Sequence, residues 1–255
     1  MKIYFLGTGT SQGMPVIGNK NPVSQSNDFK DKRLRVSIWI SDIDFSFVID
    51  CGPDFRQQML TSKCEQLDAI LFTHEHSDHT AGLDDIRPFN FMQKAAIPIF
   101  AHERVIENLK KRFDYIFETE NKYPGAPSVQ VNKIIKNQSF LIKNKTIIPV
   151  DAMHGNLQVF GFRINDLAYM TDIKTIEKSE IDKIKGVKVL IVNCLQETEH
   201  HSHFNLKEAL DFITLVQPEK TYLTHISYTF GFHEAIQEKL PENVFLAYDN
   251  LEITI

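Results

Sequence analysis

The sequence predicts an α/β fold in which apolar strands alternate with amphipathic helices. Short apolar runs such as Ala69–Phe72 are typical of buried strands, whereas residues 102–117 carry apolar side chains at helical spacing. Hydrophobic residues make up 42% of the 255 residues, which is ample for a core. Because no internal repeat, low-complexity segment or linker interrupts the chain, we expect one domain over residues 1–255.

Charge and cysteine content exclude several classes of protein. The formal net charge is −5, so the sequence lacks the basic footprint of a nucleic-acid binder. No apolar run reaches membrane-spanning length, and the strand-like start Met1–Leu6 is too short for a signal peptide. Cys51, Cys64 and Cys194 form no spaced pair, which indicates a reducing compartment without disulfides. We therefore expect a cytoplasmic protein.

The first strand leads into a glycine-rich turn. Residues 7–13 read Gly-x-Gly-x-x-x-Gly, one residue too long for a dinucleotide fingerprint, and no helical pattern follows them. They form either a tight polar turn or a stretch of backbone that lines a binding site and contacts the substrate. Residues 18–35 are polar and predict a loop. A hairpin follows, with strands at Val36–Ile40 and Phe45–Ile49.

Asp50 follows the second strand of this hairpin. Gly52 and Pro53 end the strand, and Asp54–Thr61 suits a short helix. Asp50 is either a turn-forming carboxylate or a group that holds a neighbouring ligand. Cys51 is expected to be a small core residue.

The rest of the chain continues to alternate strands and helices. A break is expected at Pro88, a solvated face at Lys110–Arg112 and a loop at Tyr123–Pro127. Strands are expected at residues 97–101, within 129–172, and at 187–192, 244–247 and 251–255. Helices are expected at residues 102–117, 173–184, 206–216 and 233–240.

The segment Thr73–Gly82 carries the densest set of metal-binding side chains. It places His74, His76, Asp78 and His79 directly after a buried strand. Imidazole and carboxylate groups are ligands of zinc, manganese and iron. The alternative is a solvated turn, or a helix start capped by Asp78. The combination at a strand end favours a metal site, because a rigid scaffold can hold ligands there at fixed separation.

Further candidate ligands lie at the ends of other apolar strands. His154, Asp172 and His225 each lie at the end of such a run. Any one of them alone would be interpreted as a cap or a hydrogen-bonded polar group. Their coincidence with the Thr73–Gly82 segment predicts one shared site.

A second histidine cluster precedes the helix at 206–216, for which Asn205 is the expected N-cap. The cluster is either a second metal site or a solvated loop, and His203 is the histidine nearest to this cap. The other histidines are expected in this loop (His200 and His201), or at helix starts or on the surface (His102 and His233), without a role.

The pattern His-x-His-x-Asp-His resembles the metallo-β-lactamase superfamily. This resemblance implies a four-layer αββα sandwich with metals at the edge between its sheets, whereas the strand pattern alone allows other α/β sandwiches. It implies that one ion is held by His74, His76 and His154, that a second is held by Asp78, His79 and His225, and that Asp172 bridges them. It further implies that Asp50 bonds to the metal-binding loop, and that His203 and Asp78 act in catalysis, His203 as the acid that protonates a leaving group.

Motifs along the whole chain make the resemblance specific to one branch of this superfamily. In order, Gly7–Pro15, Ile49–Asp54, Thr73–His74, Ser202–His203 and Leu223–Ser227 resemble the phosphoribosyl cyclic phosphate phosphodiesterase branch, related to the carbon–phosphorus lyase pathway. That branch carries an additional structural zinc, and the corresponding positions here are Asn19, Asn21, Ser24 and Tyr228. We therefore expect no structural zinc. Relatives often form dimers, so a homodimer is an expected assembly.

The predicted function is hydrolysis of a small or cyclic phosphodiester by two divalent ions, with zinc favoured over manganese or iron. Two such ions about 3.5–4 Å apart can share a hydroxide at neutral pH and clamp a phosphoryl group. The alternatives are a tRNA 3′-processing endonuclease, for which the sequence lacks a basic arm, a thioester or lactone hydrolase, and a non-catalytic metal-binding interaction module. We expect a small-molecule partner rather than a membrane or a nucleic acid.

Overall fold

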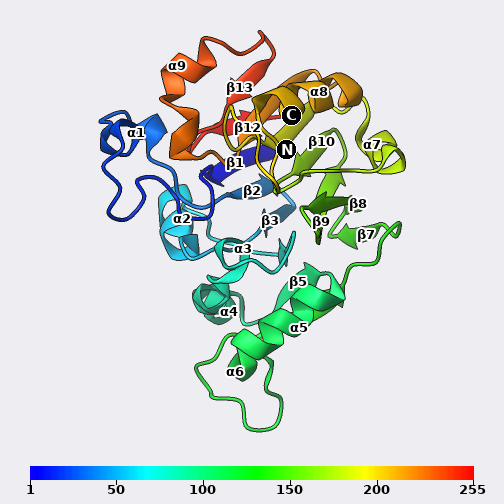
Figure 1. Ribbon diagram of the computed structural model, residues 1–255. Coiled ribbons are helices and arrows are strands. Elements are labelled where there is room, and N and C mark those ends of the chain that lie inside the picture. Colours follow the sequence, from blue (N-terminus) through cyan, green and yellow to red (C-terminus); the bar gives the residue numbers. More distant parts are fainter.

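Two seven-stranded mixed sheets face each other in the computed structural model, which describes residues 1–255. Figure 1 shows helices on the outer sides of these sheets. The first sheet has the strand order β14-β1-β2-β3-β4-β5-β6, and the second has the order β13-β12-β11-β10-β9-β8-β7. In the first sheet β3 to β6 run parallel, and in the second β10 to β13 run parallel.

The strands of the first sheet are β1 (Lys2–Gly7), β2 (Ser37–Asp42), β3 (Phe45–Ile49), β4 (Ala69–Leu71), β5 (Ile97–Ala101), β6 (Val129–Lys133) and β14 (Glu252–Thr254). Those of the second sheet are β7 (Phe140–Ile142), β8 (Lys145–His154), β9 (Leu157–Ile164), β10 (Leu167–Met170), β11 (Val189–Asn193), β12 (Lys220–Thr224) and β13 (Val244–Leu246).

The helices are α1 (Pro22–Gln25), α2 (Phe55–Ser62), α3 (Ser77–Thr80), α4 (Arg87–Gln93), α5 (Glu103–Arg112), α6 (Asp114–Phe117), α7 (Lys178–Ile184), α8 (Leu206–Val216) and α9 (His233–Gln237). Short 3₁₀ turns lie at η1 (Phe29–Asp31), η2 (Leu83–Ile86) and η3 (Tyr228–Phe230). No helix is long and apolar enough to cross a membrane.

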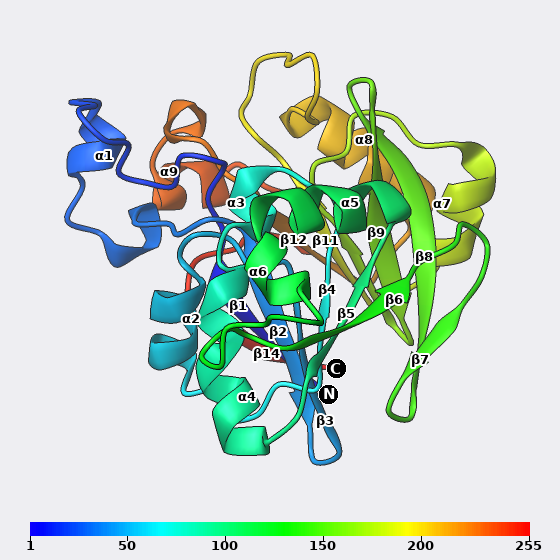
Figure 2. The same ribbon diagram turned by 90° about the horizontal axis from the view of Figure 1, so that it is seen from below.

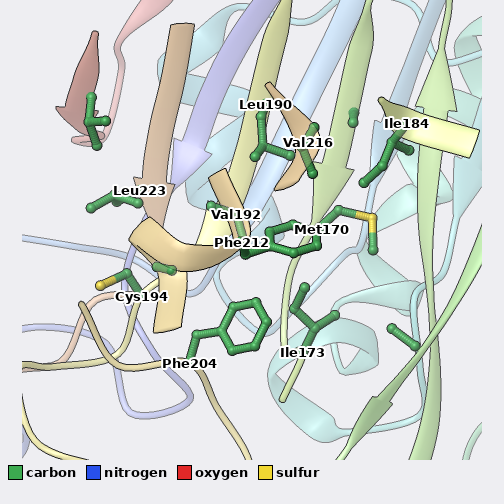
Figure 3. Close-up of a cluster of buried hydrophobic side chains, with 14 of the residues drawn as sticks. Met170, Ile173, Ile184, Leu190, Val192, Cys194, Phe204, Phe212, Val216 and Leu223 are labelled. Carbon is green, nitrogen blue, oxygen red and sulfur yellow. The ribbon is translucent and has the colours of Figure 1, made fainter. Parts of the chain in front are cut away.

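Strand alternation divides the apolar side chains among three hydrophobic clusters. Ile191 of β11 points into the cluster between the two sheets, whereas Leu190 and Val192 point outward to the cluster under α7 and α8. Figure 3 shows this outer cluster, where Phe212 of α8 packs against the sheet. The third cluster joins the first sheet to α2, α4 and α5. Three clusters between four layers confirm the predicted αββα sandwich.

Tertiary contacts change several predicted element boundaries. The helix predicted at 173–184 begins only at Lys178, because the preceding backbone pairs with Met153 and with the side chain of Asn193. The helix predicted at 102–117 is interrupted at Phe113. Pro88 lies in the first turn of α4 rather than at a break, as its fixed φ allows. The predicted loop 18–35 contains α1 and η1.

Candidate metal centre

Strands of both sheets end at one edge of the sandwich, and the predicted ligands lie there. His74 follows β4, in the segment that leads to α3. His154 is the last residue of β8, Asp172 lies just after β10, and His225 directly follows β12. The fold therefore brings together side chains that are far apart in the sequence.

One group at this edge combines His74, His76 and His154, whose ligand atoms lie within 4.8 Å of one another. Nε2 of His74 is 2.9 Å from Nδ1 of His76. Nδ1 of His154 lies 2.7 Å from the carbonyl oxygen of Ser202, so Nδ1 is the donor and Nε2 can face the site. Burial lowers the pKa of His74 and of His154, which favours the neutral, metal-binding form. His76 is exposed, so this side of the site is open to solvent.

A second group combines Asp78, His79 and His225, whose ligand atoms also lie within 4.8 Å of one another. All three side chains are buried. Nδ1 of His79 lies 2.7 Å from Oδ2 of Asp50, which also accepts a hydrogen bond from the hydroxyl of Thr73. This contact turns Nε2 of His79 toward Asp78, whose Oδ2 is 3.2 Å away.

Asp172 lies between the two groups. Its Oδ1 is 3.1 Å from Nε2 of His225, and its Oδ2 is 3.3 Å from Nε2 of His79. Oδ2 also accepts a hydrogen bond of 2.6 Å from the hydroxyl of Thr171. Asp172 forms a further compact set with His74 and His79. A carboxylate that offers oxygens in two directions is suited to contact two ions.

The backbone adopts the left-handed region at three of these strand ends. The φ angle is 64° at Asp50, 58° at Asp172 and 59° at His225. Non-glycine residues rarely occupy this region, and such strain is concentrated at functional sites. The conformation turns the chain sharply out of each strand.

The charge balance of this edge fits divalent cations. Asp50, Asp78 and Asp172 are buried, and their ion-pair partners are histidines rather than lysine or arginine. Burial acts to lower the pKa of His225, but Asp172 and Asp78 outweigh it and raise the pKa to about 9. Nε2 of His79 and Nε2 of His225 make no hydrogen bond. Ring nitrogens that face buried carboxylates without a hydrogen bond between them are a donor set suited to a divalent metal.

His203 lies beside both groups. Its ring centroid is 4.4 Å from that of His154 and 4.6 Å from that of His225, and its Nδ1 is 3.7 Å from Oδ1 of Asp172. Burial, followed by the neighbouring His225, lowers its pKa to about 2, so the neutral ring is favoured in the free protein. Asn205 caps α8 as predicted and anchors the backbone next to His203.

The neighbouring histidines occupy the predicted loop. His200 and His201 lie between β11 and α8, and the ring centroid of His200 is 5.2 Å from that of His203. His200 accepts a hydrogen bond from the backbone N–H of Ser202. His102 caps α5, as expected for a residue at a helix start.

Sequence reasoning missed a buried polar cluster around Arg33. Arg33 is 2% exposed and donates hydrogen bonds to Thr8 Oγ1 and His233 Nδ1. Thr8 Oγ1 in turn donates to Asp249, and the carbonyl of Thr8 accepts the backbone N–H of Ile226. His233 begins α9 as predicted, but it is buried within this cluster rather than on the surface. The cluster supports the backbone directly after β12.

Sequence reasoning also missed two arginines of α5 that contact the metal-binding segment. Arg104 pairs with Glu75, and Arg112 donates a hydrogen bond of 2.7 Å to Thr80 Oγ1. Lys110, Lys111 and Arg112 are exposed, as predicted, but the guanidinium of Arg112 also contacts the loop. No local spacing in the sequence links Glu75 to Arg104.

At two of the four positions that correspond to structural zinc ligands in the related branch, the side chain makes a local hydrogen bond. Asn19 Oδ1 accepts the backbone N–H of Asn21, and Asn21 Oδ1 accepts that of Val23 and caps α1. Ser24 is buried, and Tyr228 begins η3. The expected absence of a structural zinc stays a prediction.

The chain belongs to the beta-lactamase superfamily, because the family model described as "Beta-lactamase superfamily domain" matches residues 46–226. Members of this superfamily include metal-dependent hydrolases. The resemblance stated from the sequence is confirmed at the level of the superfamily, and the solved structure of a diphosphatase of the PhnP family matches the narrower branch.

That diphosphatase is 32% identical, with a TM-score of 0.92 over 99% of this chain and 96% of its own. An octanoyltransferase of Porphyromonas gingivalis is 37% identical over 100% of this chain, which spans only 52% of that relative. The short form of human tRNase Z has a TM-score of 0.72 over 100% of this chain and 99% of its own, at 18% identity, and this likeness shows the fold alone.

Proposed function

We propose that this protein is a hydrolase with two divalent metal ions that cleaves a small phosphodiester or diphosphate. The observation that carries the proposal is the pair of three-ligand groups joined by Asp172. The likeness to a PhnP-family diphosphatase over almost the whole chain supports a phosphorus-containing substrate. Metal ions near buried carboxylates would also attract an anionic phosphoryl group.

The proposed ligands of one ion are His74, His76 and His154, those of the other are Asp78, His79 and His225, and Asp172 would contact both. When bound, two divalent ions supply a nucleophile at neutral pH and neutralise charge on a phosphoryl group. Zinc suits this mixture of nitrogen and oxygen donors, and manganese or iron would also accept it.

Residues around the ligands would orient the site and the substrate. Asp50 would hold the ring of His79, and the exposed side chain of His76 marks the side from which a substrate can enter. His203 would donate a proton to the departing oxygen. An anionic substrate beside this ring would raise its low pKa toward the value that proton donation needs.

The test is hydrolysis of two probes by the metal-loaded protein, bis(4-nitrophenyl) phosphate and a nucleotide sugar with a diphosphate bond. We expect turnover of at least one probe, its loss in His76→Ala, and its retention in the control His102→Asn, which keeps a residue suited to cap α5. A protein that binds two ions and hydrolyses neither probe would overturn the phosphorus-substrate proposal.

Hydrolysis of an acyl thioester is the second candidate function. It is favoured by the 37% identity to a protein named octanoyltransferase, although this chain matches only about half of that relative. Release of free thiol from an octanoyl thioester, dependent on His76, would favour thioester hydrolysis over phosphodiester hydrolysis as the function. RNA is a weaker candidate, because a net charge of −5 offers little attraction for a polyanion.

A further inference from the structure

Glu75 lies between two proposed ligands, His74 and His76, but its carboxylate points away from them toward α5. Arg104 of α5 binds it in a bidentate manner, with Nε 2.6 Å from Oε1 and Nη2 3.1 Å from Oε2. The Glu75 side chain is 15% exposed, so this pair is partly shielded from solvent. Planar bidentate pairs of this kind fix orientation as well as distance.

Arg104 also connects the metal-binding segment to the second sheet. Its Nη2 donates a hydrogen bond of 2.6 Å to the carbonyl oxygen of Gln158 in β9. Gln158 lies beside the turn where His154 ends β8, since His154 pairs with Leu157. Figure 2 shows α5 lying across this end of the fold, near α3 and β9. One guanidinium therefore contacts the segment that carries His74 and His76, and also the residue of β9 that pairs with Met153, next to His154.

Arg112, at the other end of α5, holds the same segment from a second point. Its Nη1 donates to Thr80 Oγ1 at 2.7 Å and to the carbonyl oxygen of Glu75 at 3.3 Å. Thr80 Oγ1 donates to the carbonyl oxygen of His76 at 2.8 Å. The backbone on either side of His76 is thus attached to α5, although the His76 side chain is exposed.

We infer that Arg104 is a positioning residue that sets the affinity of the ion held by His74, His76 and His154, and leaves the other ion largely unaffected. The inference rests on the proposed two-ion site. It follows from an asymmetry, because the ring of His79 in the second group is oriented by Asp50 and not by α5. Partners outside the ligand set typically change metal affinity about 10–100-fold when they are removed.

The experiment measures Zn²⁺ affinity by competition with a chromophoric chelator, and the visible spectrum of the Co²⁺-loaded protein. For the wild type we expect two bound ions. Arg104→Met should keep one tight ion and weaken the other about 10–100-fold, with loss of part of the Co²⁺ spectrum. The Zn²⁺ affinity of Arg104→Lys at the weakened site should lie between those of the wild type and Arg104→Met, because lysine retains the charge without the bidentate geometry.

The matched control is Arg87→Met, which removes a surface arginine whose partner, Asp84, is no proposed ligand. Glu75→Gln serves as a second variant if Arg104→Met unfolds. The double variant of Arg104→Met and Glu75→Gln should be no weaker in metal binding than the weaker single variant, because the two residues act through one contact.

Equal weakening of both ions, or wild-type affinity for both in Arg104→Met, would overturn the inference while the two-ion proposal stands. A wild-type protein that binds fewer than two ions would instead overturn the proposed two-ion site, and the inference with it. Because the experiment measures metal binding, its result can be interpreted even if the protein turns over no substrate.

Discussion

The carboxylate of Asp50 and the ring of His79 lie 2.7 Å apart, and both side chains are fully buried. Because Nδ1 of His79 is used in this contact, Nε2 is the nitrogen that faces Asp78 and Asp172. A carboxylate on the far side of a metal-binding histidine fixes its tautomer and increases its basicity.

Asp50→Asn should therefore weaken metal binding about 10–100-fold. Asparagine keeps the size of the side chain and tolerates the left-handed backbone at φ 64°, so the fold should be retained. The measurement is the Zn²⁺ dissociation constant, with far-UV circular dichroism to verify folding. Wild-type affinity in a folded variant would show that the contact does not support the site.

Divalent ions should stabilise the folded protein, because they would neutralise the buried carboxylates at the site. Zn²⁺ at about 100 times its dissociation constant adds about 2.7 kcal/mol, provided that it does not bind the unfolded chain. For a chain of this size that corresponds to a Tm increase of roughly 5–10 °C. Differential scanning calorimetry with Zn²⁺ and with EDTA checks this, and Asp172→Asn should show a smaller increase. Equal Tm values in the two conditions would contradict metal binding at this edge.

His233 should make the stability sensitive to acid. Burial, followed by the Arg33 cation, lowers its pKa from 6.5 to about 4. Because the folded-state pKa is the lower one, the stabilising contribution is present above about pH 6.5 and is lost as the pH falls through about 4. The loss is at most about 1.4 kcal/mol per pH unit in this window.

Replacement by asparagine offers Arg33 an acceptor that does not titrate. Urea unfolding of the wild type and His233→Asn at pH 7 and pH 4.5 should show that the wild type loses more free energy of unfolding than the variant. An identical pH dependence in the two proteins would mean that His233 is not protonated on unfolding in this range.

Gly52 should be intolerant of a side chain. A Cβ atom at this position would lie 2.0 Å from the carbonyl oxygen of Asp78, so Gly52→Ala must displace the metal-binding loop. We expect a loss of about 1–3 kcal/mol in the free energy of unfolding, together with weaker Zn²⁺ binding. Gly18→Asn is the control, since its left-handed backbone suits asparagine and no atom lies within 4 Å of its Cβ position. Normal Zn²⁺ binding by Gly52→Ala would contradict this close packing.

The elements that could be predicted from the sequence are those determined by local pattern. The predicted bounds of β5 and α8 match the observed ones. β5 is a continuous apolar run, and α8 is an amphipathic segment with a capping residue. The αββα layering came from the family resemblance and is confirmed. Residues 173–177, in contrast, favour a helix locally, but Lys174 and Thr175 pair with Met153, and no local pattern in the sequence indicates such a partner.

The same distinction applies to the candidate site. His74, His76, Asp78 and His79 could be predicted because they lie within six residues, and His154, Asp172 and His225 because each follows an apolar strand. The contacts of Glu75 with Arg104, and of His233 with Arg33, join residues distant in sequence. Their burial and geometry exist only in the folded chain.

The left-handed backbone at Asp50, Asp172 and His225 restricts which residues can replace them in descendants that have lost catalysis. Most side chains are disfavoured in this conformation, whereas glycine and asparagine adopt it readily. A descendant that no longer binds metal would therefore be expected to accumulate glycine or asparagine at these three positions rather than a random selection of residues. Such a pattern would mark a pseudoenzyme of this lineage even after every histidine of the metal-binding loop had been replaced.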